Sequence, residues 1–229
     1  MKKILKKLYN QRLFKNIRNY FRTKKLLGKG FGQIDFKTDE GNLLFEFIKK
    51  NKFETIFEIG TWNGLGSTKT IIEAIKMTNR NVDFFSLETD KIAYKNAVKN
   101  LYEDKAYVNL LYGRILEIDD LPNLSDIDFE SFGFDPKNEE WYIQDIRRYK
   151  KTKNIFHELP LQYDFILFDG GEFSTFPEFL KLWSKTKYFA LDDTETYKQY
   201  DVLKFIEKNN NNFEILEEVR NFQIYKVIN

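Results

Sequence analysis

The residues with the clearest capacity for chemistry lie in the stretch TIFEIGTWNGLGST. Its apolar, β-branched run carries an acid near its end, and a glycine turn and a serine follow: Glu58, Gly60, Gly64, Gly66 and Ser67. A strand that turns on glycines into a helix can hold a nucleotide-like ligand at the carboxyl edge of a sheet. Glycine has no Cβ, so the backbone can approach that ligand closely. The acid would repel a pyrophosphate, so the pattern favours a ligand with hydroxyls and an ammonium, such as S-adenosylmethionine.

A second acid, Glu88, ends the next apolar run, VDFFSLE. A carboxylate at that place can accept hydrogen bonds from both hydroxyls of a ribose, and ionised acceptors make the stronger bonds. The alternative is a solvated acid at the end of a strand. We predict that Glu88 binds the ribose of the ligand, because acids at this position in nucleotide-binding folds have that role.

Three further carboxylates follow two later strands. Asp169 comes after YDFILF, and Asp192 and Asp193 come after YFAL. The carboxyl ends of parallel strands converge, so these groups would repel one another unless a cation, a lysine or a shared proton intervened. Hard oxygen ligands favour Mg²⁺ or Ca²⁺. The sequence therefore predicts a metal site, with two alternatives: Asp169 only orients a substrate, and Asp193 caps the following helix.

Two residues are candidates for a general base. Glu172 lies three positions after Asp169, and a glutamate near an acidic, buried cluster could have a raised pKa and accept a hydroxyl proton. His157 is the only histidine, in HELP before the same strand, and it would titrate in the useful range. The alternative for His157 is an ordinary surface histidine.

The apolar pattern predicts alternating strands and helices. We expect strands at 55–60, 82–88, 108–113, 163–170, 188–193, 213–219 and 222–228, and helices at 41–51, 67–77, 91–102, 175–185 and 200–209. This alternation is typical of an α/β fold with a doubly wound, mostly parallel sheet of seven strands. The last two strands have no helix between them, so they should form a hairpin that contributes one antiparallel strand.

One long connection, residues 115–161, interrupts this rhythm. Within it, the sequence EEWYIQDIRRY places Tyr142, Ile146 and Tyr149 on one face of an expected helix at 139–149. We expect this segment to be an inserted cap over the carboxyl edge of the sheet, where binding and catalytic loops gather. Trp141, Tyr142, Arg147 and Arg148 could line the substrate site.

Residues 1–30 form a separate basic extension ahead of the domain at 31–229. Residues 1–34 contain eleven Lys or Arg and no acid, whereas the remainder has 26 basic residues (37 − 11) against 35 acidic ones. Residues 2–27 show apolar side chains at helical spacing. This amphipathic helix either contacts a membrane surface peripherally, through residues 1–27, or packs on the body or on a second copy in a homodimer.

The composition of the chain excludes several other classes of protein. The chain has no cysteine, which removes disulfides and thiolate chemistry and agrees with a reducing compartment. No apolar run of about 18 residues predicts a transmembrane helix, and lysines interrupt any secretory signal. We therefore expect a cytoplasmic protein, with peripheral attachment to the inner membrane surface as the variant.

With these residues, the chain resembles the class I S-adenosylmethionine-dependent methyltransferases over about residues 40–229. It is closest to the branch of catechol-type and natural-product or sugar O-methyltransferases, whose first motif reads E-x-G-x-x-x-G-x-S. The resemblance implies that Glu58, Gly60, Gly64 and Ser67 bind the methionine half of the cofactor. It also implies that Gly113 lies near the adenine, whereas an ordinary turn glycine is the alternative.

The resemblance extends to the acidic cluster. Catechol-type relatives bind a divalent metal with an acid at the position of Asp169 and an acid–amide pair where Asp192 and Asp193 stand. Asp169 is also expected to contact the cofactor, and Glu172 stands where those relatives carry a lysine base. The implied activity is methylation of a hydroxyl on a small molecule, sugar or glycan precursor, with S-adenosylmethionine as donor and Mg²⁺ or another divalent cation as an aid.

Three other functions compete with this one. A nicotinamide-dependent short-chain-type reductase would use the same glycines, with Tyr149 and Lys153 at the spacing of its catalytic pair. A nucleic-acid methyltransferase would carry a D/N-P-P-Y/F signature where this chain reads DGGE, so no nucleic-acid partner is expected. A membrane-surface binding module would use residues 1–27 and keep the pocket as a relic.

Overall fold

The computed structural model describes residues 34–127 and 136–228. The predicted basic helical extension at 1–30 lies outside the described residues. Within the described part of the chain, no helix is both long and apolar enough to cross a membrane.

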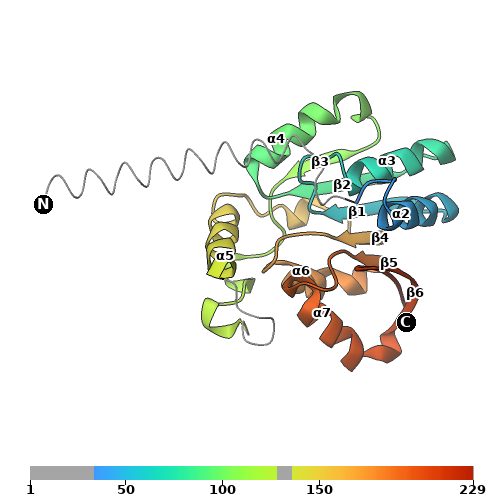
Figure 1. Cartoon of the computed structure of the whole chain (residues 1–229). Coiled ribbons are helices and arrows are strands. Elements are labelled where there is room, and N and C mark those ends of the chain that lie inside the picture. The colour runs from blue at the N-terminus through green and yellow to red at the C-terminus, as the bar shows by residue number, and fades with distance from the viewer. Residues whose placement is uncertain (1–33, 128–135, 229) are drawn as a thin grey trace, which may run out of the picture. The chain divides into compact units, whose positions relative to one another are not determined.

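A seven-stranded sheet forms the centre of the molecule (Figure 1), and it confirms the expected α/β class. Its order is β3-β2-β1-β4-β5-β7-β6. The strands are β1 (Thr55–Ile59), β2 (Asp83–Glu88), β3 (Asn109–Tyr112), β4 (Tyr163–Phe168), β5 (Thr186–Leu191), β6 (Phe213–Val219) and β7 (Phe222–Val227). β1 pairs in parallel with β2 and β4, whereas β7 is antiparallel to both β5 and β6, as the expected C-terminal hairpin requires.

Helices cover both faces of this sheet (Figure 1). They are α2 (Asp39–Lys50), α3 (Ser67–Thr78), α4 (Lys91–Asn100), α5 (Pro136–Tyr149), α6 (Thr175–Leu182) and α7 (Tyr197–Lys208). One apolar core joins α2 and α3 to the sheet, and a second core joins α6 and α7 to its other face. The two cores explain why the central strands read as continuous apolar runs.

Short-range chemistry sets where the helices begin. The Thr38 hydroxyl accepts a hydrogen bond from the Gly41 amide at 3.1 Å and so caps α2. The Asp90 carboxylate caps α4 by accepting from the amides of Ile92 at 2.7 Å and Ala93 at 3.0 Å. Asp193, expected as an alternative helix cap, does not cap α7, because the residue before that helix is Thr196.

The carboxyl ends of the strands are tied together by main-chain hydrogen bonds. The Gly60 amide donates to the Leu87 carbonyl at 2.9 Å, and the Asp169 amide donates to the Ile59 carbonyl at 3.0 Å. The loops after β1, β2 and β4 therefore form one continuous edge, on which the sequence-predicted site residues lie.

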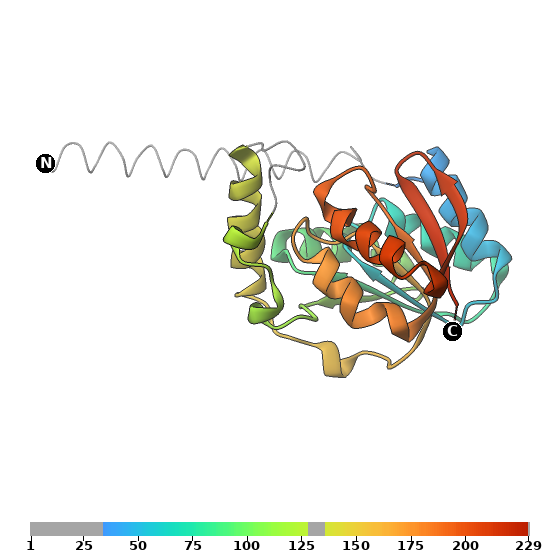
Figure 2. The same cartoon turned by 90° about the horizontal axis from the view of Figure 1, so that it is seen from below.

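The long connection includes the expected helix, α5, which stands beside this edge in Figure 2. Its last residue, Tyr149, is buried in the core shared with α6 and α7. The Tyr142 hydroxyl donates to the Pro122 carbonyl at 2.9 Å. The predicted helix within 115–161 is therefore present, and the contacts of Tyr142 and Tyr149 agree with the single face on which they were placed with Ile146.

Candidate functional site

Glu58 lies in β1 and is completely buried. Its carboxylate accepts hydrogen bonds from the hydroxyls of Ser67 at 2.5 Å, Thr68 at 2.6 Å and Ser86 at 2.5 Å. Burial raises the pKa of Glu58 to about 7, although these hydroxyls oppose the shift. Glu58 and Ser67, both predicted to bind cofactor, are thus brought together, and their contact fixes the first turn of α3 to the strand before it.

The glycine turn has the backbone that its sequence predicts. Gly60 has a φ of +104° and Gly64 a φ of +78°, a region that residues with side chains rarely adopt. A Cβ on Gly60 would lie 1.9 Å from the carbonyl oxygen of Asp169, and one on Gly64 would lie 2.6 Å from the side chain of Leu101. The turn therefore packs tightly against the loops after β4 and α4.

Glu88, the last residue of β2, is nearly buried beside this turn. One carboxylate oxygen accepts from the Trp62 amide at 2.7 Å, and the other accepts from the Asp90 amide at 2.6 Å. Burial raises the pKa of Glu88 to about 7. Each oxygen of a carboxylate can accept a further hydrogen bond, so a diol such as a ribose could bind both at once.

Gly113 follows β3, on the same edge, and its amide donates to the Glu88 carbonyl at 3.1 Å. A Cβ there would lie 2.9 Å from the side chain of Ile155, which belongs to the long connection. Close packing against Ile155 therefore explains this glycine without a ligand, and its predicted place near the adenine stays a prediction.

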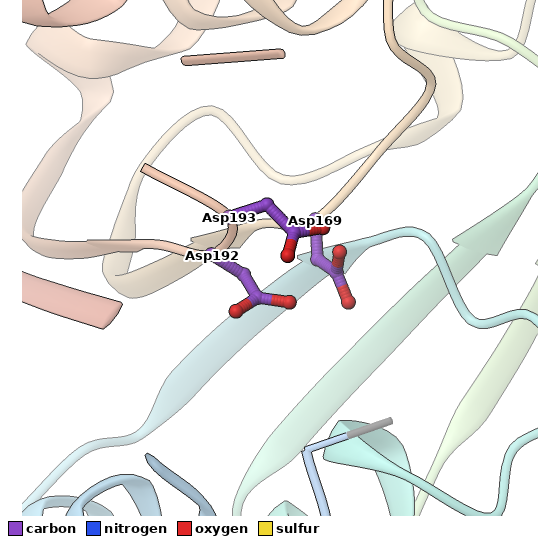
Figure 3. A group of neighbouring side chains, drawn as sticks. All are labelled: Asp169, Asp192 and Asp193. Carbon is purple, nitrogen blue, oxygen red and sulfur yellow. The ribbon is translucent and has the colours of Figure 1, made fainter. Parts of the chain in front are cut away.

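The three predicted metal ligands do lie together (Figure 3). Asp169 follows β4, and Asp192 and Asp193 follow β5. One oxygen of each lies within 4.8 Å of the others. Asp193 has a φ of +58°, so the chain turns sharply at this point. Carboxylates this close need compensating positive charge or a retained proton.

That positive charge comes from Lys198, which sequence reasoning missed. Its ammonium lies 2.7 Å from Asp169 Oδ1 and 2.8 Å from Asp193 Oδ2. Burial alone would lower the pKa of this ammonium, but the carboxylates of Asp169 and Asp193 outweigh it and raise that pKa. Lys198 follows Asp193 by only five positions in the sequence, which is the signal that could have found it.

The remaining acid of the cluster, Asp192, has surroundings that favour its protonated form. Burial, followed by the charge of Asp169, raises the pKa of Asp192 to about 8. Burial also raises the pKa of Asp169, against the effect of Lys198. Of the three devices expected from the sequence, the lysine is present, and the raised pKa values of Asp169 and Asp192 favour a shared proton as well.

The residues do not offer a divalent cation an open site. Mg²⁺ and Ca²⁺ bind oxygen ligands at about 2.0–2.6 Å. An ion held by Asp169 and Asp193 would lie within about 5 Å of the Lys198 ammonium, since that ammonium is already 2.7 and 2.8 Å from the same carboxylates. Two cations that close repel each other, more strongly in a partly buried site than in water.

The two candidate bases have different surroundings. Glu172 is half-buried, its carboxylate accepts from the Lys198 main-chain amide at 3.2 Å, and burial raises its pKa. His157 is exposed on a short helix (Phe156–Glu158). Among the described residues no hydrogen bond or ion pair joins His157 to Asp169 or Glu172, so Glu172 alone is brought to the acidic cluster.

A further buried acid lies under α5. The Tyr149 hydroxyl donates to Glu178 Oε1, and the Ser174 hydroxyl donates to Glu178 Oε2 at 3.3 Å. Burial raises the pKa of Glu178 to about 8. No sequence pattern distinguishes Glu178 from other glutamates, because it lies on α6, an ordinary amphipathic helix.

The reductase alternative loses its catalytic pair. Tyr149 is buried and donates to Glu178, and it is the last residue of α5. Lys153 lies beyond that helix and pairs with Glu158 at 2.5 Å, with 72% of its side chain exposed. The four-residue spacing therefore does not place Tyr149 and Lys153 on one helical face.

Comparison with known proteins adds to this geometry. No family model and no curated protein matches the sequence. Among solved structures, the chain resembles an O-methyltransferase from Bacillus cereus in complex with SAH, S-adenosylhomocysteine, with 14% identity, a TM-score of 0.56 and coverage of 90% of this chain and 89% of that one.

Two more solved structures give the same result. A methyltransferase from Podospora anserina bound to SAH has 13% identity and a TM-score of 0.52, covering 82% of this chain and 78% of that one. TomG of Streptomyces achromogenes, an O-methyltransferase of tomaymycin synthesis in complex with S-adenosylmethionine, has 14% identity and a TM-score of 0.51, covering 82% and 79%. The chain therefore has the fold of the class I S-adenosylmethionine-dependent O-methyltransferases.

Proposed function

We propose that this chain is an S-adenosylmethionine-dependent methyltransferase that methylates a hydroxyl oxygen. The observation that carries the proposal is the Glu88 carboxylate at the end of β2, whose two oxygens each accept one main-chain amide and retain capacity for a ribose hydroxyl. Two of the similar folds described above contain SAH and one contains S-adenosylmethionine.

The residues of the turn suit the other half of that cofactor. Gly60 and Gly64 hold the main chain in a tight loop beside Asp169, and Ser67 begins α3 directly after the loop. Main-chain amides and carbonyls in such a loop can bind an amino acid group closely. We assign the methionine half of the cofactor to this turn, with Glu58 fixing it through Ser67, and the adenine to the neighbourhood of Gly113.

S-adenosylmethionine, when bound, supplies an activated methyl group on a sulfonium sulfur. The protein therefore has to align the acceptor oxygen with that methyl group and remove the acceptor's proton. We assign proton removal to Glu172, because its half-buried carboxylate has a raised pKa and lies next to the acidic cluster. His157 remains the second candidate for this role.

Aromatic rings gather next to Glu172, the proposed base. Phe173, next to Glu172 in sequence, packs its ring 5.4 Å from that of Tyr142 and 5.4 Å from that of Tyr197. Aromatic faces suit flat or ring-shaped acceptors. We therefore propose a small molecule, a sugar or a glycan precursor as acceptor, and we propose that α5 contributes to its recognition.

The metal, the location and the assembly follow as separate proposals. A divalent cation at Asp169, Asp192 and Asp193 would have to compete with Lys198, so no step above relies on one. We propose a cytoplasmic location, with a peripheral membrane contact through residues 1–27 or a homodimer as roles for the basic extension.

Titration calorimetry with SAH tests the cofactor assignment. We expect binding to the full chain, and we expect Glu88→Gln to weaken it by about tenfold or more, because a charged hydrogen-bond acceptor is lost and such bonds contribute about 1.5–3 kcal/mol. Glu217→Gln, an exposed glutamate of β6, is the matched control and should bind SAH as the parent does.

Two results would contradict the proposal. Absence of SAH binding at high micromolar concentration would remove the methyltransferase assignment. Fluorescence enhancement of NADH on mixing, without SAH binding, would instead favour the reductase. Circular dichroism of each variant separates loss of binding from loss of folding.

A further inference from the structure

Lys198 has an unfavourable position for a lysine. It is the second residue of α7 and its side chain is only 7% exposed. The first turn of a helix carries partial positive charge, so a cation there is disfavoured. A buried ammonium is also costly unless it is paired. Both costs are offset by nearby carboxylates, above all those of Asp169 and Asp193, which contact the ammonium from two different loops.

The lysine connects the parts of the acidic cluster. Its ammonium bridges Asp169, after β4, and Asp193, after β5, at 2.7 and 2.8 Å. Its main-chain amide donates to Glu172 at 3.2 Å. The next residue, Gln199, donates to the carbonyls of Phe168 at 3.0 Å and Asp192 at 2.9 Å. The start of α7 therefore fixes both strand ends and the proposed base.

A divalent cation bound by this cluster would have the same role as the Lys198 ammonium, because its positive charge would hold the carboxylates of neighbouring strand ends together. Asp169, Asp192 and Asp193 can approach within 4.8 Å of one another. The ammonium already lies against two of the three, so a metal ion and Lys198 exclude each other.

We propose that the ammonium of Lys198 takes the place of a divalent cation at Asp169, Asp192 and Asp193, so that the proposed methyl transfer is independent of metal. This inference rests on the proposed function. Lys198 acts as a positioning residue: it holds the carboxylates and, through its amide, Glu172. Without a metal to acidify the acceptor hydroxyl, proton removal falls to a protein base, for which Glu172 is the first candidate.

The test measures Mn²⁺ binding by electron paramagnetic resonance, on the full chain freed of metal and then titrated to millimolar Mn²⁺. We expect the parent chain to leave the signal of free Mn²⁺ unchanged. Lys198→Met removes the charge and keeps most of the side-chain volume. It should gain Mn²⁺ affinity by roughly tenfold or more, a change of about 1.4 kcal/mol.

Two variants serve as controls. Lys198→Arg keeps the positive charge and should bind no more Mn²⁺ than the parent. Lys187→Met removes an exposed lysine that pairs with Asp164 at 2.7 Å, and it should also behave as the parent. A gain confined to Lys198→Met cannot come from general loss of a cation or from a role in folding alone.

Three outcomes would overturn the proposal. The first is Mn²⁺ binding to the parent that Asp193→Asn removes. The second is a gain in Lys198→Arg as large as that in Lys198→Met. The third is absence of binding to every variant, because the carboxylates would then form no cation site for Lys198 to fill. SAH calorimetry on the parent chain tests the proposed function separately. Absence of SAH binding would refute the proposed function, whereas Mn²⁺ binding by a parent chain that also binds SAH would refute only this inference.

Discussion

Buried glutamates concentrate on the carboxyl edge of the sheet. Glu58, Glu88 and Glu178 are each at most 7% exposed, and burial raises the pKa of each to about 7, about 7 and about 8. Their hydrogen-bond partners are hydroxyls and main-chain amides rather than cations. These three carboxyl groups therefore bind protons more tightly in the folded chain than in the unfolded chain.

The raised pKa of Glu178 predicts the direction in which the unfolding free energy changes with pH. Its pKa rises from an ordinary 4.5 to about 8 on folding, so the stabilising proton is fully present below pH 4.5 and lost as pH rises through 8. Between those values the unfolding free energy should fall with pH, by on the order of 1.4 kcal/mol per unit at most. Glu178→Gln should flatten this dependence, as measured by urea denaturation at pH 5, 6.5 and 8.

The matched variant is Glu217→Gln, on the exposed face of β6, which should keep the parent's dependence. Equal slopes for the parent and for Glu178→Gln would show that Glu178 is ionised in the folded chain at neutral pH. The Tyr149 hydroxyl, which donates to Glu178, should still find an acceptor in the glutamine.

Gly60→Ala tests the glycine turn. A Cβ at this position would lie 1.9 Å from the Asp169 carbonyl oxygen, and φ is +104°. We expect a loss of about 3 kcal/mol or more in unfolding free energy, because strain and a main-chain clash add, and loss of SAH binding by calorimetry. Leu65→Ala, in the same loop but with an exposed side chain, should change neither; a stable Gly60→Ala that binds SAH would refute the assigned turn.

The sequence predicted which residue types gather at this edge better than it predicted their partners. Asp169, Asp192 and Asp193 were placed together because parallel strand ends converge. The direction of the Glu58 side chain was not predictable, since it depends on three hydroxyls from two other elements. Lys198 was missed because a lysine in a helix is ordinarily solvated, and only the fold turns this one inward.

At the scale of elements, an arginine of α5 connects this helix to the loop between β2 and α4. Arg148 donates to Asp90 at 3.1 Å and to Asp145 at 3.0 Å. Asp90 in turn donates its amide to Glu88 and caps α4. The inserted cap is therefore connected to the predicted ribose acid through two residues, and Arg148 is not free to bind a substrate as its sequence neighbourhood first indicated.

Arg148→Ala should loosen this connection. We expect SAH affinity to fall by about two- to fivefold, because a partly exposed ion pair contributes at most about 1 kcal/mol. Arg147→Ala removes the exposed neighbour on the same helix and is the matched control. Calorimetry on both variants decides: equal effects, or none in Arg148→Ala, would mean that α5 does not support the cofactor site.

Element order was readable because each apolar run is short and each helix has one apolar face. All seven strands and six described helices lie within about three residues of the predicted bounds: α5 begins at Pro136 and, likewise three residues before its predicted start, α7 begins at Tyr197. That shift matters, because it brings Lys198 into the helix and against the acids. Thr196, the residue before α7, is a favoured N-cap type, although its hydroxyl makes no capping hydrogen bond.

At the scale of the whole chain, charge is divided between two regions. Residues 1–34 carry eleven positive charges, and the remainder carries an excess of nine negative charges (26 − 35). An acidic body is repelled by anionic membranes and nucleic acids, whereas a basic amphipathic segment is attracted to both. Any contact with an anionic surface should therefore depend on residues 1–34 and on the salt concentration.

Vesicle sedimentation tests this division. The full chain should bind vesicles of anionic lipid but not zwitterionic ones, and added salt should weaken the binding. Changing Lys2, Lys3, Lys6 and Lys7 to Gln should weaken it by about tenfold or more, since each lysine near an anionic surface contributes about 1 kcal/mol. SAH binding should be unaffected, because the predicted cofactor residues all lie beyond position 57. The four substitutions could instead leave vesicle binding unchanged and alter the mass measured by light scattering. That result would mean that the segment serves a homodimer rather than a membrane, because a second copy would then cover its apolar side chains.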